Sequence, residues 1–153
     1  MNSMSVNIRK IIPADLDRVY PLADEFIEDT AAQYMLKLTA EHVRSLADKF
    51  MAHSFVMEWN GAIVGIFVGG ITEHFLDGKE IYQEIIWFVS KPFRMYSIKL
   101  LDAAENYCKM MRIEYFVTAC LINDNTERFK KLYKRRGAVP LELHFIKEVD
   151  ICQ

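Results

Sequence analysis

The chain has 153 residues, the size of one ordinary domain, and its 19 basic and 21 acidic residues give a net charge of −2. This balance gives no general attraction to nucleic acid or to an anionic membrane. The three cysteines have no metal-binding spacing, and no apolar stretch approaches the roughly 18 residues of a membrane span. We therefore expect one soluble, cytoplasmic domain over residues 1–153, without a metal site.

The first 50 residues predict one strand and two helices. Val6–Ile12 is typical of a strand that Pro13 ends, and Pro13 and Asp15 both suit the first turn of a helix. Apolar residues then recur at helical spacing, and Pro21 is expected to kink or split this helix. A second helix is expected after Thr39, whose side chain suits the N-cap position.

The middle of the chain predicts three strands. Asn60-Gly61 lies between the β-rich runs Ser54–Trp59 and Ala62–Ile71, which is the strongest short signal of a hairpin. Ile81–Val89 is apolar toward its end, as a central strand covered on both faces would be. A loop is expected over Ser90–Tyr96.

The last third alternates helices and strands. We expect a helix over Ser97–Met111, a strand over Tyr115–Ile122, a helix over Thr126–Arg136 that Gly137 ends, and a strand over Leu141–Val149. The full order is β-α-α-β-β-β-α-β-α-β. This order predicts an α/β (α+β) fold with a mixed sheet, because an antiparallel meander leads into β-α-β crossovers.

Two motifs stand at the ends of this series. Residues Ile8–Asp15 read IRKIIPAD, and residues Phe129–Ala138 read FKKLYKRRGA. Together with the order of elements, these motifs resemble the opening and closing motifs of the GNAT superfamily of N-acetyltransferases. The resemblance implies a mostly antiparallel central sheet flanked by helices. It also implies direct transfer of an acetyl group from acetyl-CoA to a primary amine, and dimers are common in the family.

The resemblance extends to the cofactor loop, where the family has the motif Q/R-x-x-G-x-G/A. Arg94 matches the first position, but Ser97 and Lys99 replace the two glycines. Such a loop holds a diphosphate through backbone N–H groups at a helix N-terminus, and glycine lets the backbone approach closely. The resemblance implies that CoA lies where the fourth and fifth strands part, with its pantetheine arm on backbone groups of Phe88 and Val89. The diphosphate contacts implied are Arg94, Met95, Tyr96, Ser97 and Ile98.

Three further residues are candidates by resemblance, and each also has a structural interpretation. Tyr133 occupies the family's general-acid position, but an amphipathic tyrosine with a buried ring would look the same. Glu84 could take the proton from the amine, since apolar neighbours would raise its pKa; it could equally face solvent or pair with a lysine. Asn125 could contact the CoA arm or cap the following helix.

Two other interpretations stay open. A GNAT-fold module that binds a ligand without catalysis is favoured by the glycine-free loop. A nucleic-acid-binding domain would rest only on the basic cluster of the last predicted helix, a pattern that is more often a solvated face. The acceptor, a small-molecule or peptide amine, and a homodimer are expected from the family resemblance alone. The basic cluster consists of Lys130, Lys131, Lys134, Arg135 and Arg136.

Overall fold

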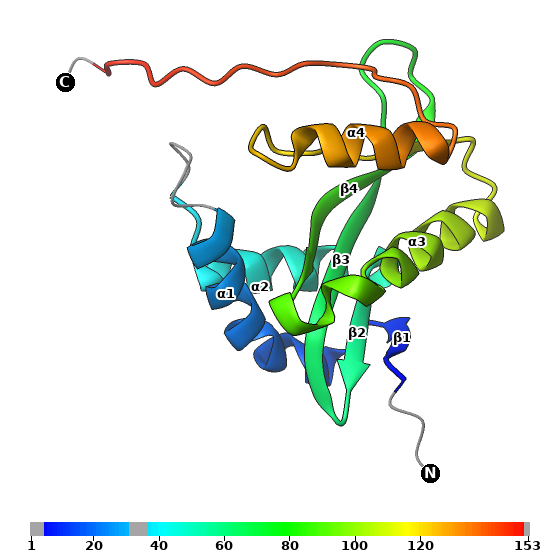
Figure 1. Ribbon diagram of the computed structural model, residues 1–153. Helices are drawn as coiled ribbons and strands as arrows, with labels where there is room; N and C mark the ends of the chain where they lie inside the picture. The colour runs from blue at the N-terminus through cyan, green and yellow to red at the C-terminus, as the bar shows by residue number, and fades with distance from the viewer. Residues whose placement is uncertain (1–4, 31–36, 152–153) are drawn as a thin grey trace. The chain divides into compact units, whose positions relative to one another are not determined.

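Local sequence signals set the start of the fold. The computed structural model describes residues 5–30 and 37–151 (Figure 1). Strand β1 (Asn7–Lys10) leads into the 3-10 helix η1 (Pro13–Val19) and then α1 (Tyr20–Thr30). The interruption predicted at Pro21 is the change from 3-10 to α geometry. It falls there because proline has no N–H to donate, and the first turn of an α-helix is where that loss is tolerated.

The second helix and the hairpin follow their predicted signals. In α2 (Ala40–Lys49) the His42 backbone N–H donates to the Thr39 hydroxyl at 3.2 Å, so Thr39 is the N-cap. A short 3-10 helix, η3 (Met51–His53), precedes the hairpin. In the hairpin turn, Asn60 and Gly61 have φ of 47° and 79°. Both values are left-handed, as a two-residue turn between twisted antiparallel strands requires.

The sheet has five strands in the order β1-β2-β3-β4-β5. Strands β2 (Phe55–Trp59), β3 (Ala62–Glu73) and β4 (Glu80–Val89) form an antiparallel meander beside β1. Strand β5 (Tyr115–Val117) pairs with β4 in parallel. The predicted mixed, mostly antiparallel sheet flanked by helices is therefore confirmed.

Helices cover both faces of this sheet (Figure 1). Helices α1 and α2 bury one apolar face, and α3 (Ile98–Met110) packs on the other. Between α3 and the sheet lies a group of aromatic rings, one of them from α3 itself, with centroids 5.4 to 6.2 Å apart. Burial of such rings contributes strongly to core stability, so they help to hold α3 on the sheet. The rings belong to Phe67, Tyr82, Tyr107 and Phe116.

The described chain divides into two compact units, Met1–Thr118 and Ala119–Gln153, and the elements named so far belong to the first. The second unit holds α4 (Thr126–Arg135). Gly137 has φ of 85°, its N–H donates to Lys134 O, and Ala138 N–H donates to Tyr133 O. These two bonds form a Schellman motif, so the predicted glycine end of the helix is confirmed.

Two strand predictions in the last third need correction. The predicted strand Tyr115–Ile122 is shorter, because its pairing with β4 ends at Val117. The predicted strand Leu141–Val149 is wrong: residues 138–151 have no regular secondary structure, and Phe145 is 89% exposed. Apolar alternation alone does not make a strand, since backbone N–H and C=O groups need a neighbouring strand to pair with.

Candidate active site

Strand β4 pairs with β5 over only part of its length. Its parallel pairing with β5 covers only Ile81–Gln83. From Glu84 to Val89, β4 pairs with β3 alone within the described part of the Met1–Thr118 unit. The printed register of β4 with β5 therefore ends at Gln83, before the second half of β4.

Val89 presents its backbone to the edge of β4 that faces away from β3. It stands opposite Gly65, and the Ser90 N–H donates to Val64 O at 2.8 Å. This bond makes Val89–Gly65 a non-hydrogen-bonded pair, so the N–H and C=O of Val89 point away from β3. Backbone groups alternate in direction along a strand, so the N–H and C=O of Phe88 point toward β3. Of the two residues expected to hold the pantetheine arm, only Val89 has its backbone at the edge.

The turn after β4 is helical and is not an open loop. The expected loop Ser90–Tyr96 is largely the 3-10 helix η4 (Lys91–Tyr96), which runs straight into α3. Ser97 donates its N–H to Arg94 O at 3.1 Å and accepts from Leu100 N–H at 3.1 Å. Its φ of −56° and ψ of −33° are right-handed helical values. Serine replaces the family's glycine here without strain, because this backbone needs no positive φ.

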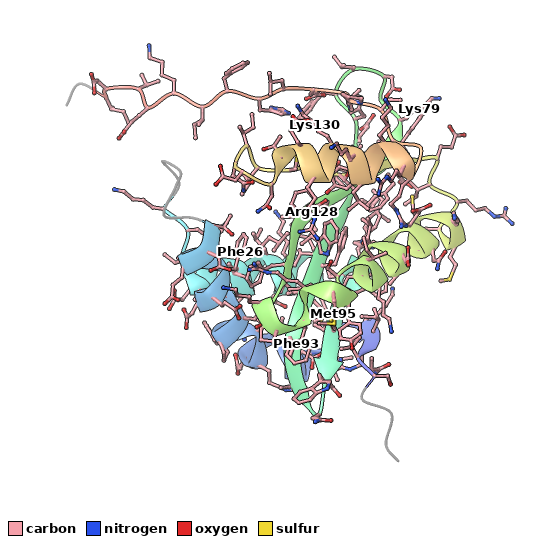
Figure 2. The ribbon with its side chains drawn as sticks, viewed as in Figure 1. Phe26, Lys79, Phe93, Met95, Arg128 and Lys130 are labelled. Carbon is pink, nitrogen blue, oxygen red and sulfur yellow. The ribbon has the colours of Figure 1, made fainter. Side chains whose placement is uncertain are left out.

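Met95 and Lys99 of the turn are exposed, while Tyr96 is half-buried. Met95 is 76% exposed, and Lys99 is exposed with its ammonium 5.5 Å from the centre of the Tyr96 ring. Neither Met95 nor Lys99 is inserted beside β4. Ile98 begins α3 and is half-buried. Figure 2 shows Phe93 and Met95 on this turn.

Residues far away in the sequence anchor the turn. Glu25 of α1 accepts from the Ser90 hydroxyl at 2.7 Å and from the Lys91 N–H at 3.0 Å. Asp29 of α1 forms an ion pair with Arg94. The rings of Phe93 and Trp59 also pack together, with centroids 5.2 Å apart. The sequence interpretation missed Glu25 and Asp29; the available signal was a carboxylate pair at i and i+4 on one helix face.

Glu84 lies where β4 and β5 part. It is half-buried, stands opposite Gly69 and precedes a β-bulge at Ile85. Side chains alternate along a strand, which places Glu84 on the same face as Tyr82, the face that α3 covers. Bulges commonly re-aim side chains near active sites. The position is therefore compatible with either of the two interpretations given to Glu84 by the sequence.

The second unit carries Tyr133 and Asn125. The Tyr133 hydroxyl donates to Ala119 O at 3.1 Å, and its ring stacks on Phe129. Asn125 occupies the N-cap position of α4, and its C=O accepts from Phe129 N–H at 3.0 Å. Its side chain makes no capping bond; instead the Asn123 side chain accepts from the Asn125 N–H at 2.8 Å.

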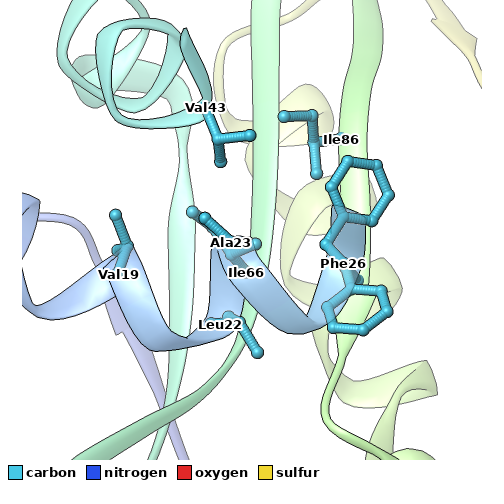
Figure 3. A pocket seen from close by; sticks show the side chains of 8 residues that line it. Val19, Leu22, Ala23, Phe26, Val43, Ile66 and Ile86 are labelled. Carbon is cyan, nitrogen blue, oxygen red and sulfur yellow. The ribbon is translucent and has the colours of Figure 1, made fainter. Parts of the chain in front are cut away.

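The crevice shown in Figure 3 belongs to the core. All eight side chains that line it, from η1, α1, α2, β3 and β4, are apolar. Phe26 and Phe88 close one end, with ring centroids 5.2 Å apart. It offers no donor, acceptor or base, so proton transfer has no partner there. We assign it to packing between α1 and the sheet.

Two further searches concern only residues 5–30 and 37–151. No three His, Cys, Asp or Glu side chains gather there in a way that could hold a metal ion. None of the helices in these ranges combines the length and the apolar character needed to cross a bilayer.

Solved structures of N-acetyltransferases resemble this chain. A ribosomal-protein-alanine N-acetyltransferase from Brucella melitensis biovar Abortus 2308 matches with a TM-score of 0.69 and 14% identity, over 95% of this chain and 100% of that one. A glucosamine-6-phosphate N-acetyltransferase from Arabidopsis thaliana matches with a TM-score of 0.65 and 18% identity, over 95% and 99%. The aminoglycoside N-acetyltransferase AAC(6')-Iy, in complex with CoA, matches with a TM-score of 0.72 and 12% identity, over 96% of each chain.

No protein-family model matches the sequence, and no curated protein does. The structural matches nevertheless cover nearly the whole of this chain and of each neighbour. The chain therefore has the GNAT fold, a mixed five-stranded sheet flanked by helices. At identities of 12–18% this likeness establishes the fold, while the acceptor of each neighbour belongs to that neighbour.

Proposed function

We propose that this protein is an N-acetyltransferase that moves an acetyl group from acetyl-CoA to a primary amine. The observation that carries the proposal is the Val89 backbone, which faces the edge of β4 away from β3 and leads directly into the anchored turn before α3. An extended arm can pair with such an edge, and the turn lies at its end. The GNAT fold supports the same assignment by analogy.

The residues of the first unit fit a CoA-type ligand. The Val89 backbone would pair with the amides of the pantetheine arm. Arg94 is a cation at the end of that edge, and a guanidinium matches phosphate oxygens with paired donors. The N–H of Ser97 already bonds Arg94 O, so side chains would carry more of the diphosphate contact than in a glycine loop. Ile98 and Tyr96 would supply apolar contact.

The proposed reaction needs one base and one acid. Acetyl-CoA supplies an activated acetyl group as a thioester. The amine nitrogen bonds to the acetyl carbon, and the carbon–sulfur bond breaks. Glu84 takes the proton that the amine loses, and Tyr133 gives its hydroxyl proton to the departing sulfur. Holding the reactants in line supplies much of the rate.

The remaining parts of the proposal concern context. The acceptor is a primary amine on a small molecule or peptide, and nucleic acid and membrane are not partners. Lys130 of the basic cluster pairs with Glu127 at 2.9 Å, which supports a solvated face. The three cysteines are odd in number and far apart in the sequence, which supports a reducing, cytoplasmic location. A homodimer is proposed from the resemblance.

Calorimetric titration with acetyl-CoA and CoA is the first test. Binding at micromolar to millimolar ligand is expected. With an amine that supports thiol release, Tyr133→Phe should lower kcat about a hundredfold and leave the CoA Kd within about twofold. Tyr115→Phe, which removes the hydroxyl of another tyrosine, is the control and should change neither. An unchanged kcat for Tyr133→Phe would show that another group is the acid.

A non-catalytic binding module is the second candidate. It is favoured by one observation: Arg94 is already paired with Asp29, and the Ser97 N–H is already bonded. The absence of heat with acetyl-CoA and CoA at millimolar concentration would establish this candidate over the transferase.

A further inference from the structure

Two carboxylates of α1 hold the turn between β4 and α3. Glu25 and Asp29 are four residues apart, so both project from one face of the helix. Glu25 accepts from the Ser90 hydroxyl and the Lys91 N–H, and Asp29 pairs with Arg94. These contacts join residues 65 or 66 positions apart in the sequence.

The Arg94 side chain contacts the last two residues of β4. Its Nε donates to Val89 O at 3.3 Å, and its guanidinium lies 5.8 Å from the centre of the Phe88 ring. Phe88 in turn packs on Phe26, which Figure 2 labels on α1 and which follows Glu25. The stack and the Glu25 contacts keep the turn against α1. Asp29 is thereby held within reach of the guanidinium.

We propose that Asp29 competes with the ligand's diphosphate for Arg94 and so lowers the affinity of this site for CoA. The inference rests on the proposed CoA site. A carboxylate and a diphosphate are both anions that a guanidinium binds through its N–H donors, so Arg94 cannot serve both fully. The Arg94 and Asp29 side chains are 49% and 43% exposed. An exposed pair of this kind is weak and can be exchanged for a ligand.

Removing the carboxylate should therefore tighten binding. In Asp29→Asn the Arg94 guanidinium loses its charged partner and is left for the diphosphate. We expect the Kd for CoA to fall roughly three- to tenfold. The gain should shrink at high salt, because Arg94 and Asp29 interact as exposed charges. Dephospho-CoA, which keeps the diphosphate but lacks the 3′-phosphate, should show the same gain.

The experiment is a set of calorimetric titrations of the full chain with CoA and dephospho-CoA at low and high salt. Glu28→Gln is the matched control: it removes the same charge from an exposed position of α1 next to Asp29. A second control repeats Asp29→Asn in an Arg94→Ala background. If Asp29 acts through Arg94, the gain is absent in that background.

The outcomes distinguish competition by Asp29 from the existence of the CoA site itself. Tighter binding in Asp29→Asn but not in Glu28→Gln supports the proposal, as does binding that appears only once Asp29 is replaced. Equal effects of the two substitutions, or a gain that survives in Arg94→Ala, would overturn it while leaving the CoA site in place. A gain with CoA but not with dephospho-CoA would overturn the assignment to the diphosphate. No binding by any variant would refute the proposed function as well.

Discussion

Asp15→Asn should be the most damaging single-charge change in the first unit. The Asp15 side chain is fully buried. Its two oxygens accept from Arg9 at 2.6 and 2.9 Å, from Arg18 at 2.9 Å and from the Ile12 N–H at 3.0 Å. This explains the IRKIIPAD opening physically: the aspartate ties β1 to the start of η1. An amide can keep some of these bonds but removes the charge that two guanidiniums face.

Breaking a buried ion pair costs about 3–5 kcal/mol. Arg9 is 27% exposed and keeps Glu58 as a partner at 2.7 Å, so we expect the lower end, about 3 kcal/mol. That is a large share of the roughly 5–15 kcal/mol by which proteins are stable. For a chain of this length it corresponds to a fall in Tm of about 6–12 °C.

Urea unfolding followed by tryptophan fluorescence measures this loss. The matched control is Asp17→Asn, because Asp17 is 81% exposed and pairs with Arg44 at 2.9 Å. An exposed pair contributes up to about 1 kcal/mol, so this control should be nearly neutral. If Asp15→Asn costs no more than Asp17→Asn, the buried network does not stabilise the fold as argued.

Two further predictions concern pH and packing. Hydrogen bonds from Arg9 lower the pKa of Asp15 and of Glu58 from their ordinary values of 3.8 and 4.5. Their contribution to stability is therefore complete above those values and is lost as pH falls through the folded-state pKa. In thermal melts from pH 7 to pH 3, the Tm should fall steeply at the acid end, and Asp15→Asn should make this fall shallower. Gly69→Ala should cost about 2–3 kcal/mol in urea unfolding, since its Cβ would lie 2.5 Å from Cζ of the buried Tyr82 ring. Gly65→Ala, whose nearest contacts are 3.1 Å, should cost less, and equal losses would contradict the clash.

Features coded by a few adjacent residues could be predicted from the sequence. The Asn60-Gly61 turn, the Thr39 N-cap and the Gly137 helix end each depend on bonds within about five residues, and all three are confirmed. The Leu141–Val149 strand failed because a strand depends on a partner elsewhere in the chain. Asp29 escaped notice for the same reason: on an amphipathic helix it looks like a solvated charge until the turn 65 residues away is in place.

In the glycine-free turn, side chains rather than backbone N–H groups would make most of the contacts with the diphosphate. In a glycine loop, backbone N–H groups face the diphosphate, and the helix dipole adds to their attraction. Here the turn is already wound, the Ser97 N–H bonds Arg94 O, and Lys99 lies against the Tyr96 ring. Arg94 is then the cation at the end of the β4 edge that can meet a diphosphate without rebuilding the backbone. Its pairing with Asp29 therefore has a larger effect here than in a loop whose backbone N–H groups also bind the diphosphate, and Arg94→Ala should weaken CoA binding.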